Sequence, residues 1–238
     1  MNTILHKALT RGHADHGWLN SWHTFSFGGY HDPSRIHFGA LRVLNDDSVA
    51  PGMGFGKHPH DNMEIISIPL EGDLEHQDDT GTNQVIRKGD VQIMSAGSGI
   101  AHSEKNKNKN QPVKFLQIWV FPNKKNVEPR YDQKTFSEEE KKNKLLTVVS
   151  PIDSDDESIH IHQDAWFSIG KLDQDTEVSY DIRKKGNGVY AFLLEGDATI
   201  NDIGMNRRDG LGISETDKLK IKADSNAEIL LMEVPMTI

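Results

Sequence analysis

The stretch IPLEGDLEHQ, at residues 68–77, recurs as FLLEGDATIN at residues 192–201, with an offset of 124 residues. In both copies, apolar residues precede a Gly-Asp turn and further strand-forming residues follow it, which is the pattern of two strands joined by a tight turn. A second turn follows each copy, in RKGDVQIMSAG at residues 87–97 and in RRDGLGISE at residues 207–215. The same order of strands and turns in both halves predicts an internal duplication and two similar domains.

Short segments of alternating apolar and polar residues make up much of the chain. Residues 93–95 and 115–121 show this period-two alternation, and Gly, Asp and Pro residues separate such segments. Long stripes with the 3.6-residue period of an amphipathic helix are absent. The pattern predicts an all-β protein built from sandwiches or barrels.

A polar segment poor in aliphatic residues, NKKNVEPRYDQKTFSEEEKKNK, lies between the two halves. Within it, Ser137 and Glu140 have the spacing of a capping box, which predicts a short surface helix. The halves also differ in composition, because ten of the twelve histidines precede residue 123. We therefore predict an N-terminal domain at residues 1–122, a connector at 123–145 and a C-terminal domain at 146–238.

Composition excludes several classes of protein. The net charge of −9, from 27 basic and 36 acidic residues, disfavours binding to nucleic acid or to an anionic membrane. The longest apolar run, Val189–Leu194, is far shorter than the roughly 20 residues of a membrane-spanning helix. The N-terminus lacks the apolar region of a secretory signal. Because there is no cysteine, disulfides, thiol nucleophiles and iron–sulfur clusters are excluded, and we expect a cytoplasmic protein.

Two pairs of metal-ligand side chains occur in the N-terminal half. His58 and His60 are separated by one residue, as are His102 and Glu104. Because residues i and i+2 of a strand point to the same face, the members of each pair would project together. Two such pairs on separate strands would supply three imidazoles and one carboxylate, a set that suits a divalent transition metal better than calcium. Two unrelated surface pairs are the alternative.

Two further side chains near these pairs have simpler interpretations. Continued alternation from His58 and His60 would place Glu64 on the same face of the chain. His76 follows the first Gly-Asp turn, and we expect it at the surface or at the mouth of a barrel.

The second half lacks the corresponding ligands. The offset of 124 residues carries His58 and His60 onto Ile182 and Lys184. The pair at His160 and His162 precedes the repeated turn by more than thirty residues, and we interpret it as one exposed face of a strand. A single metal per chain, in the first domain, is the resulting expectation.

The residues around these pairs resemble the pirin family of bacterial pirin-like proteins. The resemblance rests on GMGFGKHPHDNMEI, LEGDLEHQD and KGDVQIMSAGSGIAHSE, together with the upstream stretches RGHADHGWLNSWHTFSFGGYHDP and LRVLNDDSVAPG. In the second half, HQDAWF and ADSNAEILLMEVP resemble the same family, so the similarity spans nearly the whole chain. Among its members, the chain is most similar to those described as quercetin 2,3-dioxygenases.

This resemblance implies a bicupin, in which two barrels of the double-stranded β-helix or jelly-roll type are joined by a short helix. It implies one metal in the N-terminal barrel, usually iron, although copper, nickel, cobalt, manganese and zinc also fit. Carried onto this sequence, the ligands would be His58, His60, His102 and Glu104. Glu64 would contact a ligand imidazole and orient it without binding the metal itself. Direct coordination of the metal by Glu64 is the alternative.

The resemblance also implies an activity. A flavonol such as quercetin would react with O₂ at the metal, its heterocycle would open and carbon monoxide would leave, with Glu104 as ligand and proton acceptor. The alternative is a metal-dependent regulatory protein that binds other proteins and has no catalysis of its own. The acidic chain lacks a run of Lys and Arg of the kind that directs proteins to the nucleus, which favours the cytoplasmic enzyme.

Overall fold

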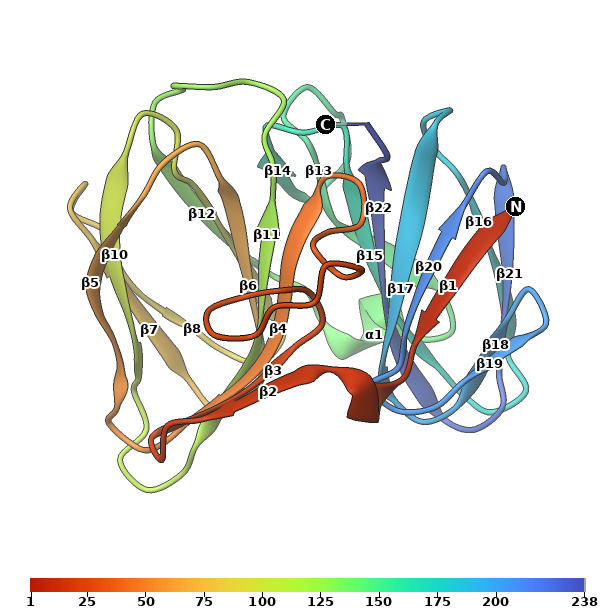
Figure 1. Ribbon diagram of the computed structural model, residues 1–238, viewed down its shortest axis with the longest axis horizontal. Helices are drawn as coiled ribbons and strands as arrows, with labels where there is room; N and C mark the ends of the chain where they lie inside the picture. Colours follow the sequence, from red (N-terminus) through yellow and green to blue (C-terminus); the bar gives the residue numbers. More distant parts are fainter. Residues whose placement is uncertain (238) are drawn as a thin grey trace.

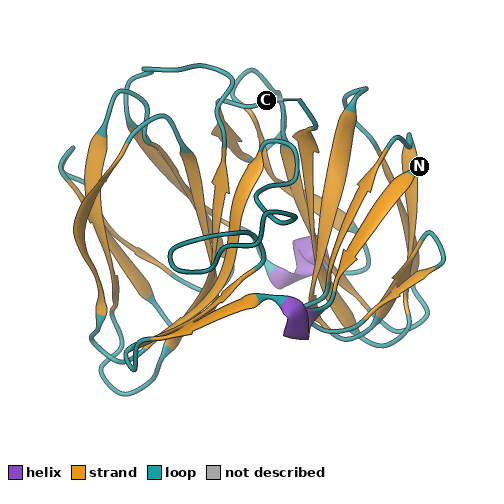
Figure 2. Ribbon diagram, viewed as in Figure 1, coloured by secondary structure: helices purple, strands orange, loops and turns teal. Residues whose placement is uncertain are grey.

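The computed structural model describes residues 1–237, and nearly all of its regular structure is β-strand (Figures 1 and 2). Two modules lie side by side, with a seven-stranded sheet of each at the centre and a four-stranded sheet on each outer flank. The all-β bicupin is therefore confirmed, although each module is a jelly-roll-like pair of sheets and not a closed barrel. No helix in the described part of the chain has the length and apolar character needed to cross a membrane.

The N-terminal module contains β2 to β12. Its seven-stranded sheet has the order β12-β9-β6-β11-β4-β3-β2, and its four-stranded sheet has the order β5-β10-β7-β8. The larger sheet consists of β2 Gly12–Asp15, β3 Leu19–His23, β4 Leu41–Val49, β6 Glu64–Glu71, β9 Asp90–Ser95, β11 Val113–Val120 and β12 Arg130–Thr135. The smaller sheet consists of β5 Gly54–His60, β7 Leu74–Asp78, β8 Asn83–Ile86 and β10 Ile100–Asn106.

The C-terminal module contains β1 and β13 to β22. Its sheets have the orders β1-β20-β17-β22-β15-β13-β14 and β16-β21-β18-β19. The larger sheet consists of β1 Asn2–His6, β13 Leu145–Pro151, β14 Ile159–Ile161, β15 Trp166–Leu172, β17 Asn187–Glu195, β20 Gly210–Ser214 and β22 Ala227–Pro235. The smaller sheet consists of β16 Glu177–Asp181, β18 Ala198–Ile200, β19 Ile203–Met205 and β21 Lys218–Ala223.

The two predicted copies of the repeat are equivalent hairpins. Strands β6 and β7 flank Gly72 just as β17 and β18 flank Gly196, and the two glycines have φ angles of 77° and 78°. This left-handed backbone is the conformation that favours glycine at a tight turn. A side chain at Gly196 would also place its Cβ 2.1 Å from the carbonyl oxygen of Asn226.

Two strands do not follow the predicted division of the chain. The first strand, β1, pairs with β20 of the C-terminal module, with Leu5 opposite Leu211. The strand β12, which lies in the predicted connector, pairs with β9 of the N-terminal module. The boundaries at 1–122, 123–145 and 146–238 stay a prediction, because strand pairing joins residues from both sides of them.

The connector also contains the predicted helix. Helix α1, Glu138–Lys141, begins after Ser137, which forms the capping box with Glu140. The backbone N–H of Ser137 donates to Oε2 of Glu140 at 2.7 Å, and the backbone N–H of Glu140 donates to Oγ of Ser137 at 3.3 Å. A 3-10 helix at Ala8–Thr10 is the other short helix of the described chain.

The two central sheets pack against each other through one hydrophobic cluster. Leu44 and Ile66 enter it from the N-terminal module, and Phe167, Tyr190 and Leu230 enter it from the C-terminal module. All five are almost completely buried. Because removal of apolar surface from water is the main favourable term in folding, each module depends on the other for its stability.

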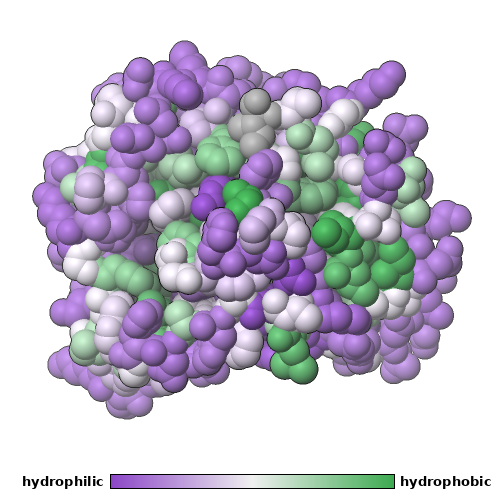
Figure 3. Space-filling view, in the orientation of Figure 1, coloured by the Kyte–Doolittle hydropathy of each residue, from purple (hydrophilic) through white to green (hydrophobic). Residues whose placement is uncertain are grey.

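The outer surface is mostly hydrophilic in the view of Figure 3. An apolar area lies on the right of that view, where Figure 1 places β1 and β20, and Ile4 of β1 is 45% exposed.

Candidate metal centre

Three of the four predicted ligands meet between β5 and β10. These strands pair antiparallel, with His58 opposite His102, and alternation along β5 brings His60 to the same face as His58. The ring centroids lie 4.5 Å apart for His58 and His102, 4.8 Å for His58 and His60, and 5.0 Å for His60 and His102. One nitrogen from each imidazole therefore lies within the distance that a shared metal ion requires.

Glu104 lies deeper in the N-terminal module. The pairing of β10 with β5 is irregular between His102 and Glu104, so a β-bulge precedes the carboxylate. Its Oε1 accepts a hydrogen bond from Oγ of Ser67 at 3.1 Å, and its Oε2 accepts one from Nε2 of Gln117 at 2.6 Å. A carboxylate oxygen of Glu104 groups with His102 and His76, whereas His58 and His60 group with His102. His102 is thus the residue common to both groups.

His60 and His102 have the electrostatic character of metal ligands. Burial, together with neighbouring His58, lowers the pKa of His60 to about 4. Burial and the surrounding histidines lower the pKa of His102 to about 2. Both rings are therefore neutral near pH 7, and neutral imidazole is the form that coordinates a metal.

Hydrogen bonds leave particular nitrogens free. Nδ1 of His58 lies 2.7 Å from the carbonyl oxygen of Gly56, which can only accept, so the ring donates there and Nε2 keeps its lone pair. Nε2 of His102 is buried and has no hydrogen-bond partner. A buried polar atom without a partner is costly, and a metal ion would satisfy it. The donor set of three imidazoles and one carboxylate thus fits a divalent transition metal.

Glu64 lies on the opposite face of its strand from the one that we predicted. The chain turns at Asn62, whose φ of 46° interrupts the alternation between β5 and β6. Glu64 accepts a hydrogen bond from Oγ of Ser95 at 2.7 Å and another from the backbone N–H of His162 in the C-terminal module. Burial raises the pKa of Glu64 to about 7. The alternation along β6 instead turns Ser67 toward Glu104.

His76 was expected at the surface or at a barrel mouth, and this expectation is wrong. Its side chain is completely buried on β7 beside His102. Its Nε2 lies 3.0 Å from Oδ2 of Asp78, and its Nδ1 lies 3.4 Å from Nδ1 of His102. The signal was present in the sequence, because His76 and Asp78 are themselves an i, i+2 pair of polar residues on a strand.

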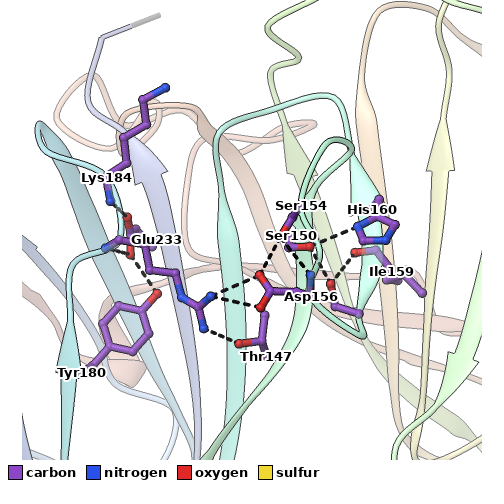
Figure 4. A network of polar contacts seen from close by, with 11 residues as sticks. Thr147, Ser150, Ser154, Asp156, Ile159, His160, Tyr180, Lys184 and Glu233 are labelled. Atoms are coloured by element: carbon purple, nitrogen blue, oxygen red, sulfur yellow. Dashed lines mark hydrogen bonds and ion pairs between the residues drawn. The ribbon is translucent and has the colours of Figure 1, made fainter.

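The C-terminal module contains a different polar cluster (Figure 4). Glu233 of β22 accepts hydrogen bonds from the hydroxyl of Tyr180 at 2.8 Å and from the backbone N–H of Lys184 at 3.0 Å. His160 is half-buried there and contacts Oγ of Ser150 at 3.1 Å. Within residues 1–237, both groups of candidate metal ligands come from the N-terminal module.

Comparison with known proteins places this architecture in a family. The Pirin family model matches residues 5–120, and the model of the quercetinase C-terminal cupin domain matches residues 147–234. A quercetin 2,3-dioxygenase of Escherichia coli K12 is 43% identical over 231 residues, which cover 97% of this chain and 98% of that protein. The chain belongs to the pirin family. A pirin-like protein of Caulobacter vibrioides is 38% identical over 93% of this pirin and 95% of its own length.

Solved pirin structures have the same fold. The crystal structure of the bacterial pirin YhhW of Escherichia coli in complex with nickel(II) matches this pirin with a TM-score of 0.93 and 42% identity, over 98% of this chain and 99% of that chain. A quercetin 2,3-dioxygenase of Acinetobacter baumannii matches with a TM-score of 0.78 at 18% identity, which shows a shared fold alone.

Proposed function

We propose that this pirin is a metal-dependent dioxygenase that opens the heterocycle of a flavonol such as quercetin. The ligands that we propose are His58, His60, His102 and Glu104. The observation that carries the proposal is the grouping of one ring nitrogen from each of His58, His60 and His102, together with a buried Nε2 of His102 that has no hydrogen-bond partner. The name of the relative from Escherichia coli supplies the reaction class.

The metal that we propose is iron(II), as the family resemblance implies, at one ion per chain. The nickel(II) of the pirin YhhW indicates that a site in that protein accepts another divalent ion. When bound, the metal would supply the Lewis acid and redox chemistry that couples a flavonol to O₂. The balanced reaction adds both oxygen atoms of O₂ to the flavonol skeleton and expels one of its carbons as carbon monoxide.

Glu104 is the residue that we propose as the proton acceptor for the flavonol hydroxyl. Ser67 and Gln117 donate to its two oxygens and hold the carboxylate in one orientation. Such fixed donors restrict the side chain, so that the acceptor is positioned before substrate binds. We further propose a cytoplasmic location, with the flavonol and O₂ as the small-molecule partners.

The direct test is aerobic turnover of quercetin by the iron-loaded protein. Carbon monoxide should form in step with the loss of flavonol absorbance, chelation should abolish both, and readdition of iron(II) should restore them. Elemental analysis should give one metal ion per chain. Absence of carbon monoxide from the fully loaded protein, across several flavonols, would contradict the proposal and favour the regulatory alternative.

A pair of variants tests the role of Glu104. Glu104→Gln keeps the size of the side chain and removes its charge, so turnover should fall far more than metal occupancy. Glu75→Gln makes the same change on the outward face of β7, where Glu75 pairs with Lys107, and turnover should be unaffected. Wild-type turnover by fully loaded Glu104→Gln would exclude Glu104 as the proton acceptor.

A further inference from the structure

A line of three buried polar side chains runs through the N-terminal module to the candidate metal centre. Oδ2 of Asp78 lies 3.0 Å from Nε2 of His76, and Nδ1 of His76 lies 3.4 Å from Nδ1 of His102. The side chains of Asp78 and His76 have no exposed surface, and His102 is 2% exposed. The ring of Tyr131 lies against His76, with 4.8 Å between the centroids. Water therefore has little access to this line of groups.

The hydrogen bonds of Asp78 determine which nitrogen of His76 carries the proton. Oδ1 of Asp78 accepts from the backbone N–H groups of Thr80 and Thr82, each at 3.0 Å, which leaves Oδ2 for His76. The hydroxyl of Thr80 also donates to Oδ1, at 2.7 Å, and these three donors stabilise the ionised form of the carboxylate. Because an ionised carboxylate can only accept, Nε2 of His76 must be the protonated nitrogen.

The proton on His76 in turn determines the tautomer of His102. In a neutral imidazole with hydrogen on Nε2, Nδ1 has a lone pair. That lone pair faces Nδ1 of His102, so Nδ1 of His102 must carry hydrogen and donate it. A neutral His102 then has its remaining lone pair on Nε2, the buried atom without a partner.

We propose that the Asp78–His76 pair sets the tautomer of His102 and keeps the lone pair of its Nε2 available to the metal. This inference rests on the proposed function only in taking His102 as a ligand. Asp78 and His76 are positioning residues, because they act on the metal through His102. Partners of this kind orient ligand imidazoles in many metal sites.

The C-terminal module supports this role by contrast. The offset of 124 residues that relates the two hairpins carries His76 onto Ile200, which is completely buried in an apolar cluster. The module without clustered imidazoles thus has an apolar residue at the position of His76. The fold itself does not require an imidazole there.

Asp78→Asn tests the proposal, because the structure predicts how the new amide would lie. The backbone N–H groups of Thr80 and Thr82 would retain the amide oxygen, so the amide NH₂ would face Nε2 of His76. His76 would then accept at Nε2 and donate from Nδ1, which moves the proton of His102 onto Nε2. With nickel(II) as the probe, we expect the affinity to fall by about 10- to 100-fold.

The tautomer can be observed directly in the metal-free protein. Nitrogen-15 NMR of the histidine rings should show His102 protonated on Nδ1 in the wild type and on Nε2 in Asp78→Asn. Glu75→Gln, the same change of charge on the outward face of the same strand, should change neither the tautomer nor the nickel affinity.

Two variants of His76 separate the hydrogen-bond role from packing. His76→Gln can donate to Asp78 through its amide NH₂ and accept from His102 through its carbonyl, so nickel affinity should stay within a few-fold of the wild type. His76→Leu can do neither, and affinity should fall. In the His76→Leu background, Asp78→Asn should have no further effect, whereas independent structural roles would add. The comparison of His76→Gln with His76→Leu tests the proposal even if Asp78→Asn fails to fold.

His58→Ala separates this inference from the proposed ligand set. Wild-type nickel affinity in His58→Ala would contradict the ligand set and with it the proposed function. A different result would overturn the positioning role alone. In that result, His58→Ala loses most of its nickel affinity, while Asp78→Asn keeps both wild-type affinity and the wild-type tautomer of His102. Equal loss of affinity in His76→Gln and His76→Leu would also overturn it.

Discussion

In the N-terminal module, Ser67 of β6 lies opposite Gln117 of β11, whereas Ala191 of β17 lies opposite Leu231 of β22 at the corresponding place in the C-terminal module. The next strands differ in the same way. His76 of β7 pairs with Glu104 of β10, and their counterparts on β18 and β21 are Ile200 and Ile221. At these matched positions, the same arrangement of strands thus encloses polar side chains in one module and apolar side chains in the other.

This difference separates the requirements of the fold from those of the site. The counterparts Ala191, Ile200, Leu219 and Ile221 are all buried in one apolar cluster. Replacing a set of hydrogen-bonded polar groups by apolar groups of similar shape is nearly neutral or stabilising. The polar interior of the N-terminal module is therefore not needed for folding, and its hydrogen bonds around Glu104 and His102 are consistent with a metal-binding role.

The largest expected effect comes from placing a polar ligand in the apolar interior. Ile221→Glu places a carboxylate at the position that corresponds to Glu104. Its neighbours there are apolar, so the buried carboxylate would have no side-chain hydrogen-bond donor. We expect a loss of about 3–5 kcal/mol in the free energy of unfolding, measured by denaturant titration. Ile221→Val, as a control, should cost about 0.5–1.5 kcal/mol. Unchanged stability in Ile221→Glu would show that the two interiors differ less than the structure indicates.

The reverse change should abolish the site. His102→Leu gives the N-terminal module the residue found at Leu219 and removes the group common to both candidate ligand clusters. Nickel(II) affinity should fall by more than the roughly 100-fold that loss of an outer partner costs, as measured by competition with a chelator. His160→Leu, a histidine outside both clusters, should keep wild-type affinity. Similar losses in the two variants would contradict the assignment of the site to the N-terminal module.

The pH dependence of stability tests the buried carboxyl that joins the modules. Because the pKa of Glu64 is about 7 in the folded protein and 4.5 as its ordinary value, the folded state binds more protons between these values. Its contribution is present below pH 4.5 and is lost as the pH rises through 7, at up to about 1.4 kcal/mol per pH unit. Glu64→Gln should flatten the curve of unfolding free energy across this window. An identical curve in the variant would exclude Glu64 as the source.

The smallest expected effect comes from Ser67→Ala, which gives β6 the residue found at Ala191. Oε1 of Glu104 would lose its donor, while Gln117 would keep its hydrogen bond to Oε2. We expect a loss of about 0.5–1.5 kcal/mol in stability and a weaker effect on nickel affinity than in His102→Leu. Ser150→Ala offers a comparison in the C-terminal module, where a buried serine contacts His160. A loss of metal as complete as in His102→Leu would show that Ser67 is essential for the site.

Sequence alone established the features that depend on local pattern. The repeated Gly-Asp turns at Gly72 and Gly196 indicated the duplication, because a tight turn needs residues that accept a left-handed backbone. The i, i+2 spacing brought His58 and His60 together, because side chains alternate along any regular strand. The short helix followed from a capping box, which involves only neighbouring residues.

Tertiary structure decided everything that depends on which strands meet and on where alternation stops. Glu64 faces the C-terminal module because the turn at Asn62 resets the alternation. His76 reaches His102 because β7 pairs with β10, a partner that no local pattern specifies. The pairing of β1 with β20 of the C-terminal module depends on contacts between residues far apart in the sequence. The hydrophobic cluster shared by the two modules depends on such contacts as well. Local alternation is a property of each strand, whereas pairing depends on the packing of the whole chain.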